Sequence, residues 1–96
     1  MANEDVRGDV FKALSDPSRR QILHLVAEHT LSAGEIADHF DFTKPSLSRH
    51  LKILRQAELV VTERRGTRIE YRANLTVLQD ALARLMGGLG IGETHE

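Results

Sequence analysis

The stretch from Thr43 to Gln56, TKPSLSRHLKILRQ, constrains the fold more than any other part of this 96-residue chain. Its apolar residues recur at i, i+4 and i+7, on one side of a helix: Leu47, Leu51 and Leu54. Thr43 is a suitable N-cap, and Pro45 falls in the first turn, where N–H groups have no partner within the helix. The sequence therefore predicts a helix with one buried face and a fixed N-terminal end.

The other sides of this predicted helix carry hydroxyl groups and positive charge: Lys44, Ser46, Ser48, Arg49, Lys52 and Arg55. A helix N-terminus with such side chains suits phosphate oxygens and base edges, because free N–H groups, the helix dipole and cations favour anionic or acceptor-rich partners. The same pattern also fits an amphipathic surface helix whose basic side is simply solvated. The flanking sequence is needed to choose between these two interpretations.

Length and composition allow one compact domain and exclude several kinds of function. With 41% hydrophobic residues, 96 residues can form one small core but not two. The absence of cysteine excludes disulfides, thiolate metal ligands and a cysteine nucleophile. The polar, acidic start of the chain and the lack of an apolar run of about 20 residues predict a cytoplasmic protein that does not cross a membrane.

The net charge of −1 conceals an uneven distribution along the chain. Residues 43–72 contain eight Lys or Arg against three Glu, a net +5, so the rest of the chain carries −6. A basic segment on an acidic scaffold favours a protein that meets a polyanion on one side only. A neutral domain can also show such an asymmetry by chance.

Capping residues and apolar spacing predict three helices before the central stretch. The first spans about residues 4–14, and Asp16 caps a second helix that begins with a proline. A third, short helix begins at Ser32, which has the spacing of a capping box with Glu35. Its short connection to the Thr43 helix indicates a helix-turn-helix pair.

After Gln56 the apolar period changes from helical to alternating. A short β-branched run, a turn at Gly66 and the alternation of Ile69, Tyr71 and Ala73 with charged residues predict a β-hairpin. Three arginines surround its turn: Arg64, Arg65 and Arg68. Such a hairpin is ordinary on a protein surface, but directly after a helix-turn-helix it is well placed to lie along a phosphate backbone.

Asn74 is expected to cap a last helix that carries a narrow seam of leucines. The seam has the spacing of one helix packing against another: Leu75, Leu78, Leu82 and Leu85. It predicts a second subunit as the partner, with closure of the core of a single chain as the alternative. Glycines from Gly87 onward are expected to end the helix, so that residues 1–86 form the domain and 87–96 a flexible tail.

The order of these elements is that of a winged helix-turn-helix domain, mainly α with a small β-hairpin: about five helices and a two-stranded wing. Three segments closely resemble the ArsR family of bacterial transcriptional repressors: FKALSDPSRRQIL, LSAGEIADHFDFTKPSLSRHLKILRQAELV and ERRGTRIEYRAN. The similarity extends over about residues 9–85. Within the family the chain looks most like the small metal-independent members, of the sporulation-delay autorepressor kind.

This resemblance implies a homodimer joined through the first and last helices, with Val6 and Val10 on the first and the leucine seam on the last. It implies that the Thr43 helix enters the major groove of double-stranded DNA and that the wing arginines follow the backbone. Matching by position assigns DNA contacts to Lys44, Pro45, Ser48 and Arg49, and the outer side of the helix adds Ser46 and Lys52. Two recognition helices one turn of DNA apart predict an imperfect palindromic operator.

The chain departs from the metal-sensing members of the family at both of their usual sites. Those proteins carry Cys-x-Cys at the start of the third helix, where this chain has Ser-Ala-Gly at 32–34, and an Asp/His set on the last helix, where it has Leu75 and Val77. The five histidines form no i, i+4 pair, so neither a metal nor another cofactor is expected. Glu58 stands where the family usually has glycine, so the sequence does not decide the conformation of the local turn.

The predicted function is sequence-specific DNA binding as a homodimeric transcriptional repressor, with repression of its own gene included. An enzyme is not expected, because the chain lacks a Gly-rich phosphate loop, and Ser48 and His50 point about 200° apart on a helix. The competing interpretation is a winged helix that binds other proteins. Lysine, serine and arginine on the recognition face favour DNA over that alternative.

Overall fold

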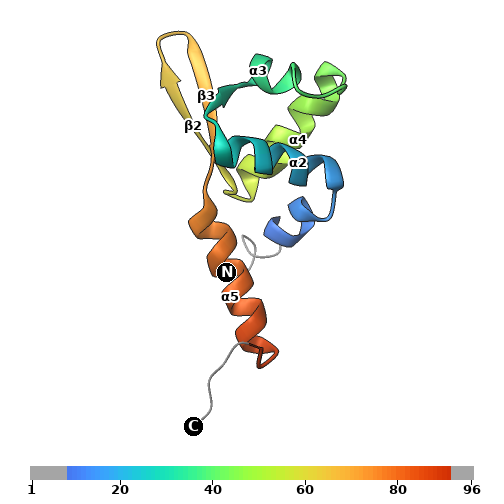
Figure 1. Cartoon of the computed structure of the whole chain (residues 1–96), viewed down its shortest axis with the longest axis vertical. Helices are drawn as coiled ribbons and strands as arrows, with labels where there is room; N and C mark the ends of the chain where they lie inside the picture. The colour runs from blue at the N-terminus through green and yellow to red at the C-terminus, as the bar shows by residue number, and fades with distance from the viewer. Residues whose placement is uncertain (1–8, 92–96) are drawn as a thin grey trace.

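The computed structural model describes residues 9–91 of the chain (Figure 1). Its elements are helical residues 9–14, then α2 (Pro17–Glu28), β1 (Leu31–Ser32), α3 (Ala33–Ala37), α4 (Lys44–Gln56), β2 (Val60–Arg65), β3 (Arg68–Ala73) and α5 (Leu75–Gly88). The helices α2, α3 and α4 lie on one side of the hairpin of β2 and β3, and α5 leads away from the base of that hairpin (Figure 1). The predicted start of the first helix, residues 4–8, lies outside the described residues.

Three helices begin as the sequence predicted. Asp16 accepts hydrogen bonds from two N–H groups in the first turn of α2, at 2.7 and 3.3 Å. At the start of α3, Ser32 and Glu35 form the predicted capping box. The hydroxyl oxygen of Thr43 accepts from an N–H in the first turn of α4 at 3.2 Å. Within residues 9–91, no helix has the length and apolar character needed to cross a bilayer.

The last helix begins at Leu75 as predicted, but it lacks the expected capping bond and ends later. Asn74 occupies the N-cap position, but its side chain makes no capping hydrogen bond, and its backbone N–H donates to the carbonyl oxygen of Leu59 at 2.7 Å. At the other end α5 continues through Gly88, two residues beyond the predicted domain limit. The chain turns at Gly90, whose φ of +74° suits glycine. Residues 92–96 of the predicted tail lie outside the described part of the chain.

The sheet contains a strand that the sequence pattern did not predict. Leu31 and Ser32 form β1, which pairs antiparallel with Tyr71 and Glu70 of β3, so the strand order is β1-β3-β2. Two residues are too few to show the alternation by which a strand is recognised. Because Ser32 is also the N-cap of α3, this short strand ties the wing directly to the helix-turn-helix.

One hydrophobic core joins the helices to the base of the wing. Its buried apolar residues are Val10, Ala13, Ile22, Leu23, Val26, Ile36, Leu47, Leu51, Leu54, Ala57, Leu59, Val60 and Ala81. The predicted buried face of α4 is confirmed, since its three leucines are each at most 6% exposed. The described part of α5 contributes Ala81 as its buried residue, so much of this helix lies outside the core.

The turn after α4 is a helix C-terminal motif that usually contains glycine. The N–H of Leu59 donates to the carbonyl oxygen of Leu54 at 3.0 Å, and the N–H of Glu58 donates to that of Arg55 at 2.9 Å, which is the Schellman pattern. Glu58 adopts a φ of 61°. A left-handed conformation costs a residue with a Cβ roughly 1 kcal/mol. The glutamate in place of glycine therefore leaves the turn intact but strained.

Glu58→Gly is expected to raise the free energy of unfolding by about 0.5–1 kcal/mol, because glycine adopts positive φ without this strain. Glu58→Ala is the matched control, since it removes the carboxylate but keeps the Cβ, and it should leave stability nearly unchanged. Urea denaturation of the three proteins measures the difference. Equal stabilisation by both substitutions would assign the effect to the charge of Glu58 instead of its backbone.

Candidate nucleic-acid interface

The side of α4 that faces away from the core gathers most of the side chains predicted to contact DNA. Its exposed members are Lys44, Pro45, Ser48, Arg49 and Lys52. Ser46 is half-buried at the flank of the helix. No ion pair between described residues involves Lys44, Arg49 or Lys52. These three cations are therefore available to an anionic partner.

Side chains, more than free N–H groups, supply the positive potential at the start of α4. Pro45 has no N–H, the N–H of Ser46 is bound by Thr43, and that of Leu47 donates to the carbonyl oxygen of Thr43 at 2.9 Å. The anion-binding capacity of a helix N-terminus depends on unsatisfied N–H groups. Recognition by this helix consequently depends on its cations and hydroxyl groups.

The three predicted wing arginines do not share one face of the hairpin. The strand register pairs Arg64 with Ile69, and Arg65 with Arg68. Successive residues of a strand point to opposite faces, so Arg64 lies on one face while Arg65 and Arg68 lie on the other. Nε of Arg64 donates to the carbonyl oxygen of Gly66 at 3.0 Å, and no ion pair between described residues involves this arginine.

Arg65 and Arg68 belong to a surface cluster of ion pairs, the wing network, formed by Glu35, Glu63, Arg65, Arg68 and Glu70. Glu70 is its centre: one carboxylate oxygen lies 3.0 Å from Nε of Arg65, and the other accepts from Nε of Arg68 at 3.0 Å. Arg65 also lies 3.5 Å from Glu63, and Arg68 donates to Glu35 of α3. The wing is thereby bonded to α3, and its guanidinium groups are partly neutralised.

The ionisation of two members of the wing network is shifted toward the charged form. The backbone N–H of Ser32 and the guanidinium group of Arg68 lower the pKa of Glu35. The hydrogen bond to Glu70 raises the pKa of Arg68. Both shifts have the same cause, the set of charged contacts that joins α3 to the wing.

Arg19 of α2 is a functional candidate that sequence reasoning missed. Arg19 is a buried residue, with 8% of its surface exposed. Nε and Nη2 donate to the carbonyl oxygens of Ala13 and Lys12 at 2.8 and 3.2 Å, at the C-terminal end of the first helix. Nη1 lies 3.8 Å from the carboxylate of Asp16 and 3.5 Å from Nδ1 of His50 in α4. One buried guanidinium group thus connects the first helix, α2 and α4.

The spacing of Arg19 was the signal that could have identified it. It precedes Ile22 by three residues and Val26 by seven, which places a charged residue on the buried face of α2. The pKa of the neighbouring Asp16 is lowered overall. Burial tends to raise this pKa, but hydrogen bonds from the N–H groups of Ser18 and Arg19, together with the guanidinium charge of Arg19, lower it. A charge at an inward position requires such partners.

An aromatic cluster holds the turn between α3 and α4. Phe40 and Phe42 stack with ring centroids 5.0 Å apart, and Phe42 meets the ring of His50 edge to face at 5.4 Å. Aromatic pairs favour these offset and T-shaped arrangements. His50 also contacts Arg19, so α4 is held both by the aromatic turn and by α2.

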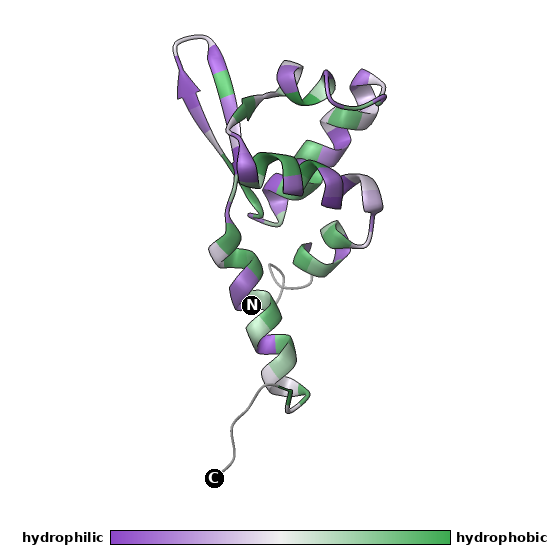
Figure 2. Ribbon diagram, viewed as in Figure 1, coloured by the Kyte–Doolittle hydropathy of each residue, from purple (hydrophilic) through white to green (hydrophobic). Residues whose placement is uncertain are grey.

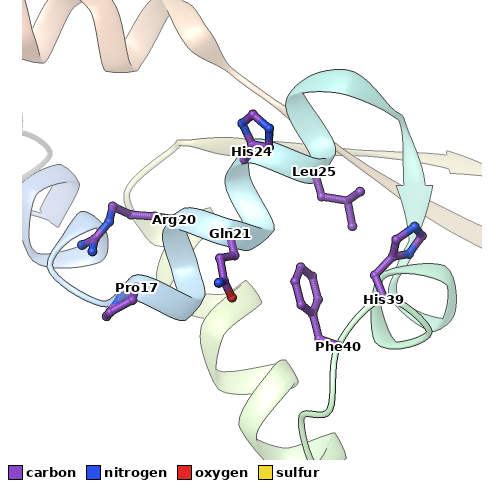
Figure 3. A pocket seen from close by; sticks show the side chains of 7 residues that line it. All are labelled: Pro17, Arg20, Gln21, His24, Leu25, His39 and Phe40. Atoms are coloured by element: carbon purple, nitrogen blue, oxygen red, sulfur yellow. The ribbon is translucent and has the colours of Figure 1, made fainter.

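A hollow of about 550 Å³ lies between α2 and the end of α3, lined by Pro17, Arg20, Gln21, His24, Leu25, His39 and Phe40 (Figure 3). Arg20 and His24 point away from Phe40 in this view. Arg20 donates to the carbonyl oxygen of Leu14 at 2.6 Å, and His24 lies 3.3 Å from Glu28. Among the described residues, no three potential metal-binding side chains converge here or elsewhere. The outer face of α4 remains the better candidate site.

The leucine seam of α5 is largely exposed in the single chain. Figure 2 shows apolar residues along this helix, in contrast to the polar hairpin. Leu78 packs partly against the core, whereas the exposed members of this apolar stripe are Leu75 (43%), Leu82 (40%), Leu85 (44%), Met86 (41%) and Leu89 (66%). A groove of about 330 Å³ between α2 and α5 is continuous with it. So large an unpartnered apolar stripe indicates a surface that is covered by a partner.

The first helix presents a different residue from the one predicted. Val10 was assigned to the dimer interface, but it is 0% exposed inside the chain and offers no surface to a partner. Phe11 beside it is 36% exposed. Val6, the other predicted contact on this helix, lies outside the described residues. The surface that the first helix can offer is therefore centred on Phe11.

Comparison with known proteins relates these features to one family. Residues 16–62 match the family described as bacterial regulatory protein, arsR family. The chain is 47% identical over 85 residues to the transcriptional repressor SdpR of Bacillus subtilis (strain 168), covering 88% of this chain and 94% of that protein. It is 40% identical over 76 residues to the arsenical resistance operon repressor of Staphylococcus aureus, covering 79% and 73% of the two chains.

Solved structures with the same architecture confirm the winged helix-turn-helix fold. An ArsR-like transcriptional regulator from Rhodococcus sp. RHA1 superposes with a TM-score of 0.82 at 29% identity, covering 94% of this chain and 84% of that one. The homodimeric winged helix-turn-helix DNA-binding domain Mb0332 from Mycobacterium bovis gives a TM-score of 0.71 at 29% identity, covering 96% and 86%. The relatives are transcriptional regulators, a class that is not enzymatic. As its sequence resemblance predicted, the chain belongs to the ArsR family of DNA-binding bacterial transcriptional regulators.

Proposed function

We propose that this chain is a cytoplasmic homodimeric repressor that binds an imperfect palindromic operator, including one at its own gene. The outer face of α4 supports this function most directly, because a helix anchored through buried leucines presents there Ser48 and three cations that form no ion pair with any described residue. A hydroxyl- and cation-rich face of this kind suits DNA better than an apolar protein surface. The name of its relative SdpR, a transcriptional repressor, supports repression as the outcome of binding.

The residues of this interface have different tasks in the proposal. Arg49 and Ser48, near the start of α4, reach base edges in the major groove, where a bidentate arginine can select guanine. Lys44 and Lys52 contact phosphates on either side. Of the three arginines around the turn of the wing, Arg64 is the one without an ion pair among the described residues, so it takes the backbone contact. Phosphate contacts position the protein but carry no base information.

Dimerisation is proposed through the exposed apolar stripe of α5 together with Phe11 of the first helix. The exposed fractions of these residues support a surface that needs a partner, and Mb0332 is described as homodimeric. A two-fold axis would place the two copies of α4 in successive major grooves about 34 Å apart. The operator should then show the same two-fold symmetry.

We further propose that the repressor lacks both metal sites of the metal-sensing members, whose positions lie within the described residues. At the position of the Cys-x-Cys pair of metal-sensing members, the hydroxyl of Ser32 is engaged in the capping box of α3. At the position of their second site, α5 carries Leu75 and Val77, which have no donor atoms in their side chains. Transition-metal sites need three or four converging N, S or O ligands.

Selection from a library of random duplexes tests the proposal, and two variants test the division of tasks. Arg49→Ala is expected to relax the selected sequence at one position in each half-site, with a loss of discrimination of about 1–3 kcal/mol. Arg64→Ala is the contrasting variant: it should weaken all duplexes alike and flatten the slope of log affinity against log salt by roughly 0.9. Failure to enrich any sequence would contradict DNA reading and favour the protein-binding alternative.

A further inference from the structure

The wing network places like charges directly opposite each other across the hairpin. The register pairs Glu63 with Glu70 and Arg65 with Arg68. Like charges in directly opposed cross-strand positions are unfavourable. The contacts of Glu70 with Arg65, diagonally across the hairpin, and with Arg68, two residues earlier on β3, offset this repulsion at 3.0 Å each. Glu70 is consequently the residue on which the arrangement of this face depends, and its side chain is 17% exposed.

The same carboxylates reduce the attraction of the wing for DNA. Three glutamates and two arginines give the wing network a net charge of −1, although the surrounding segment 43–72 carries +5. A phosphate that approaches Arg65 or Arg68 therefore competes with carboxylates that already contact the guanidinium group, with Glu70 at Nε in both cases. Non-specific DNA binding depends almost entirely on such phosphate contacts.

The network also determines how the wing is held against the helix-turn-helix. Glu35 of α3 accepts both from Arg68 of β3 and from the N–H of Ser32, the latter at 2.9 Å. Ser32 in turn pairs with Glu70 in the sheet register. Wing and α3 are therefore joined by one set of charged contacts, and exchange of a carboxylate for a phosphate would occur at this junction.

We propose that the wing network, centred on Glu70, suppresses non-specific DNA binding by holding Arg65 and Arg68 on carboxylates that only well-placed operator phosphates replace. This rests on the proposed DNA-binding function. Glu70 acts as a positioning residue, because it touches the arginines and not the DNA. In a fitted complex, α4 in the major groove holds phosphates beside the wing at high local concentration, so that they compete successfully. On random DNA the contact is brief, and the arginines remain paired with the carboxylates.

The test is Glu70→Gln, which keeps the size of the side chain and removes its charge. Affinity is measured for a duplex that the wild-type chain has selected and for a scrambled duplex of equal length and composition, each at several salt concentrations. The variant should bind the scrambled duplex roughly fivefold more tightly and the selected duplex less than twofold more tightly, so that the ratio of affinities falls. Its salt slope on the scrambled duplex should steepen by about 0.9 to 1.8, the value for one or two added phosphate contacts.

Three further variants separate this role from general effects of charge or stability. Asp80→Asn removes a carboxylate that lies 3.0 Å from Arg84 on α5, remote from the wing, and should change neither the ratio nor the slope. Glu70→Gln combined with Arg68→Gln should return the salt slope toward the wild-type value, because the released arginine is gone. Glu35→Gln retains the capping acceptor of α3 and should reproduce a smaller form of the Glu70→Gln effect.

The outcomes distinguish this inference from the function on which it rests. A wild-type chain that selects no duplex contradicts the proposed function. A wild-type chain with clear preference, whose ratio and slope are both unchanged in Glu70→Gln, overturns the role of the wing network alone. An equal gain from Asp80→Asn would also overturn it, because the effect would then follow from net charge.

Discussion

A chain carrying Leu82→Asp is expected to sediment as a folded monomer of 10.8 kDa at micromolar concentration, where the wild-type chain sediments as a dimer. In the proposed dimer the substitution would bury two unpaired carboxylates at one interface, at a cost of several kcal/mol. Leu82 is 40% exposed in the single chain, so its replacement should affect association much more than folding. Helical circular dichroism of the variant should therefore be retained.

Thr76→Asp provides the matched control for this experiment. It introduces the same carboxylate on α5, in the first turn and outside the leucine stripe, where a negative charge is favourable. This variant should remain dimeric. Loss of the dimer in both variants would attribute the effect to added charge, and a Leu82→Asp chain that stays dimeric would exclude the α5 stripe as the interface.

Arg19→Met is expected to lower the free energy of unfolding by about 2–4 kcal/mol, because it leaves the carbonyl oxygen of Ala13 without its donor in a buried place and removes the guanidinium charge beside Asp16. The carbonyl oxygen of Lys12 loses one bond but still accepts from Ser15. Methionine fills much of the space of the arginine stem, so lost hydrogen bonds and charge dominate the result. The substitution also removes the contact at 3.5 Å with His50 of α4. Urea denaturation monitored by circular dichroism measures the change in stability.

Arg19→Lys is the informative comparison. Lysine keeps the charge but offers a single ammonium group, which cannot donate to both carbonyl oxygens with the geometry of a guanidinium fork. It should recover less than half of the lost stability. Full stability in Arg19→Lys would show that charge alone is required at this site, and unchanged stability in Arg19→Met would remove Arg19 from the account of how the helices are held together.

The parts of the fold that were predictable from sequence are those encoded locally. The buried leucines of α4 repeat with the period of the helix, and Asp16, Ser32 and Thr43 cap helices through contacts with their own first turns. These signals need no knowledge of distant residues. Asn74 is at the predicted N-cap position but makes no side-chain capping bond, and the conformation of this residue also involves a tertiary hydrogen bond from its N–H to Leu59.

The candidate site was less completely predictable, because its electrostatics depend on partners far apart in the sequence. The sequence alone suggests one basic surface formed by three wing arginines, but the strand register places Arg64 on the opposite face from the other two. The partner of Arg68, Glu35, is 33 residues away in the sequence. Arg19 was overlooked because an arginine is ordinarily a surface residue. Val10 followed the spacing of an interface helix, but the core of its own chain covers it.

Recognition of a palindrome by a symmetric dimer is tested by the stoichiometry of the complex on a selected operator and on the same duplex with one half-site scrambled. Sedimentation of a fluorescent duplex should give two chains bound to the intact operator. Scrambling one half-site should weaken binding by roughly 100-fold or more, because one recognition helix then meets only non-specific DNA. A single chain bound per duplex, with equal affinity for the intact and the half-scrambled DNA, would contradict the account of a symmetric dimer reading a palindrome.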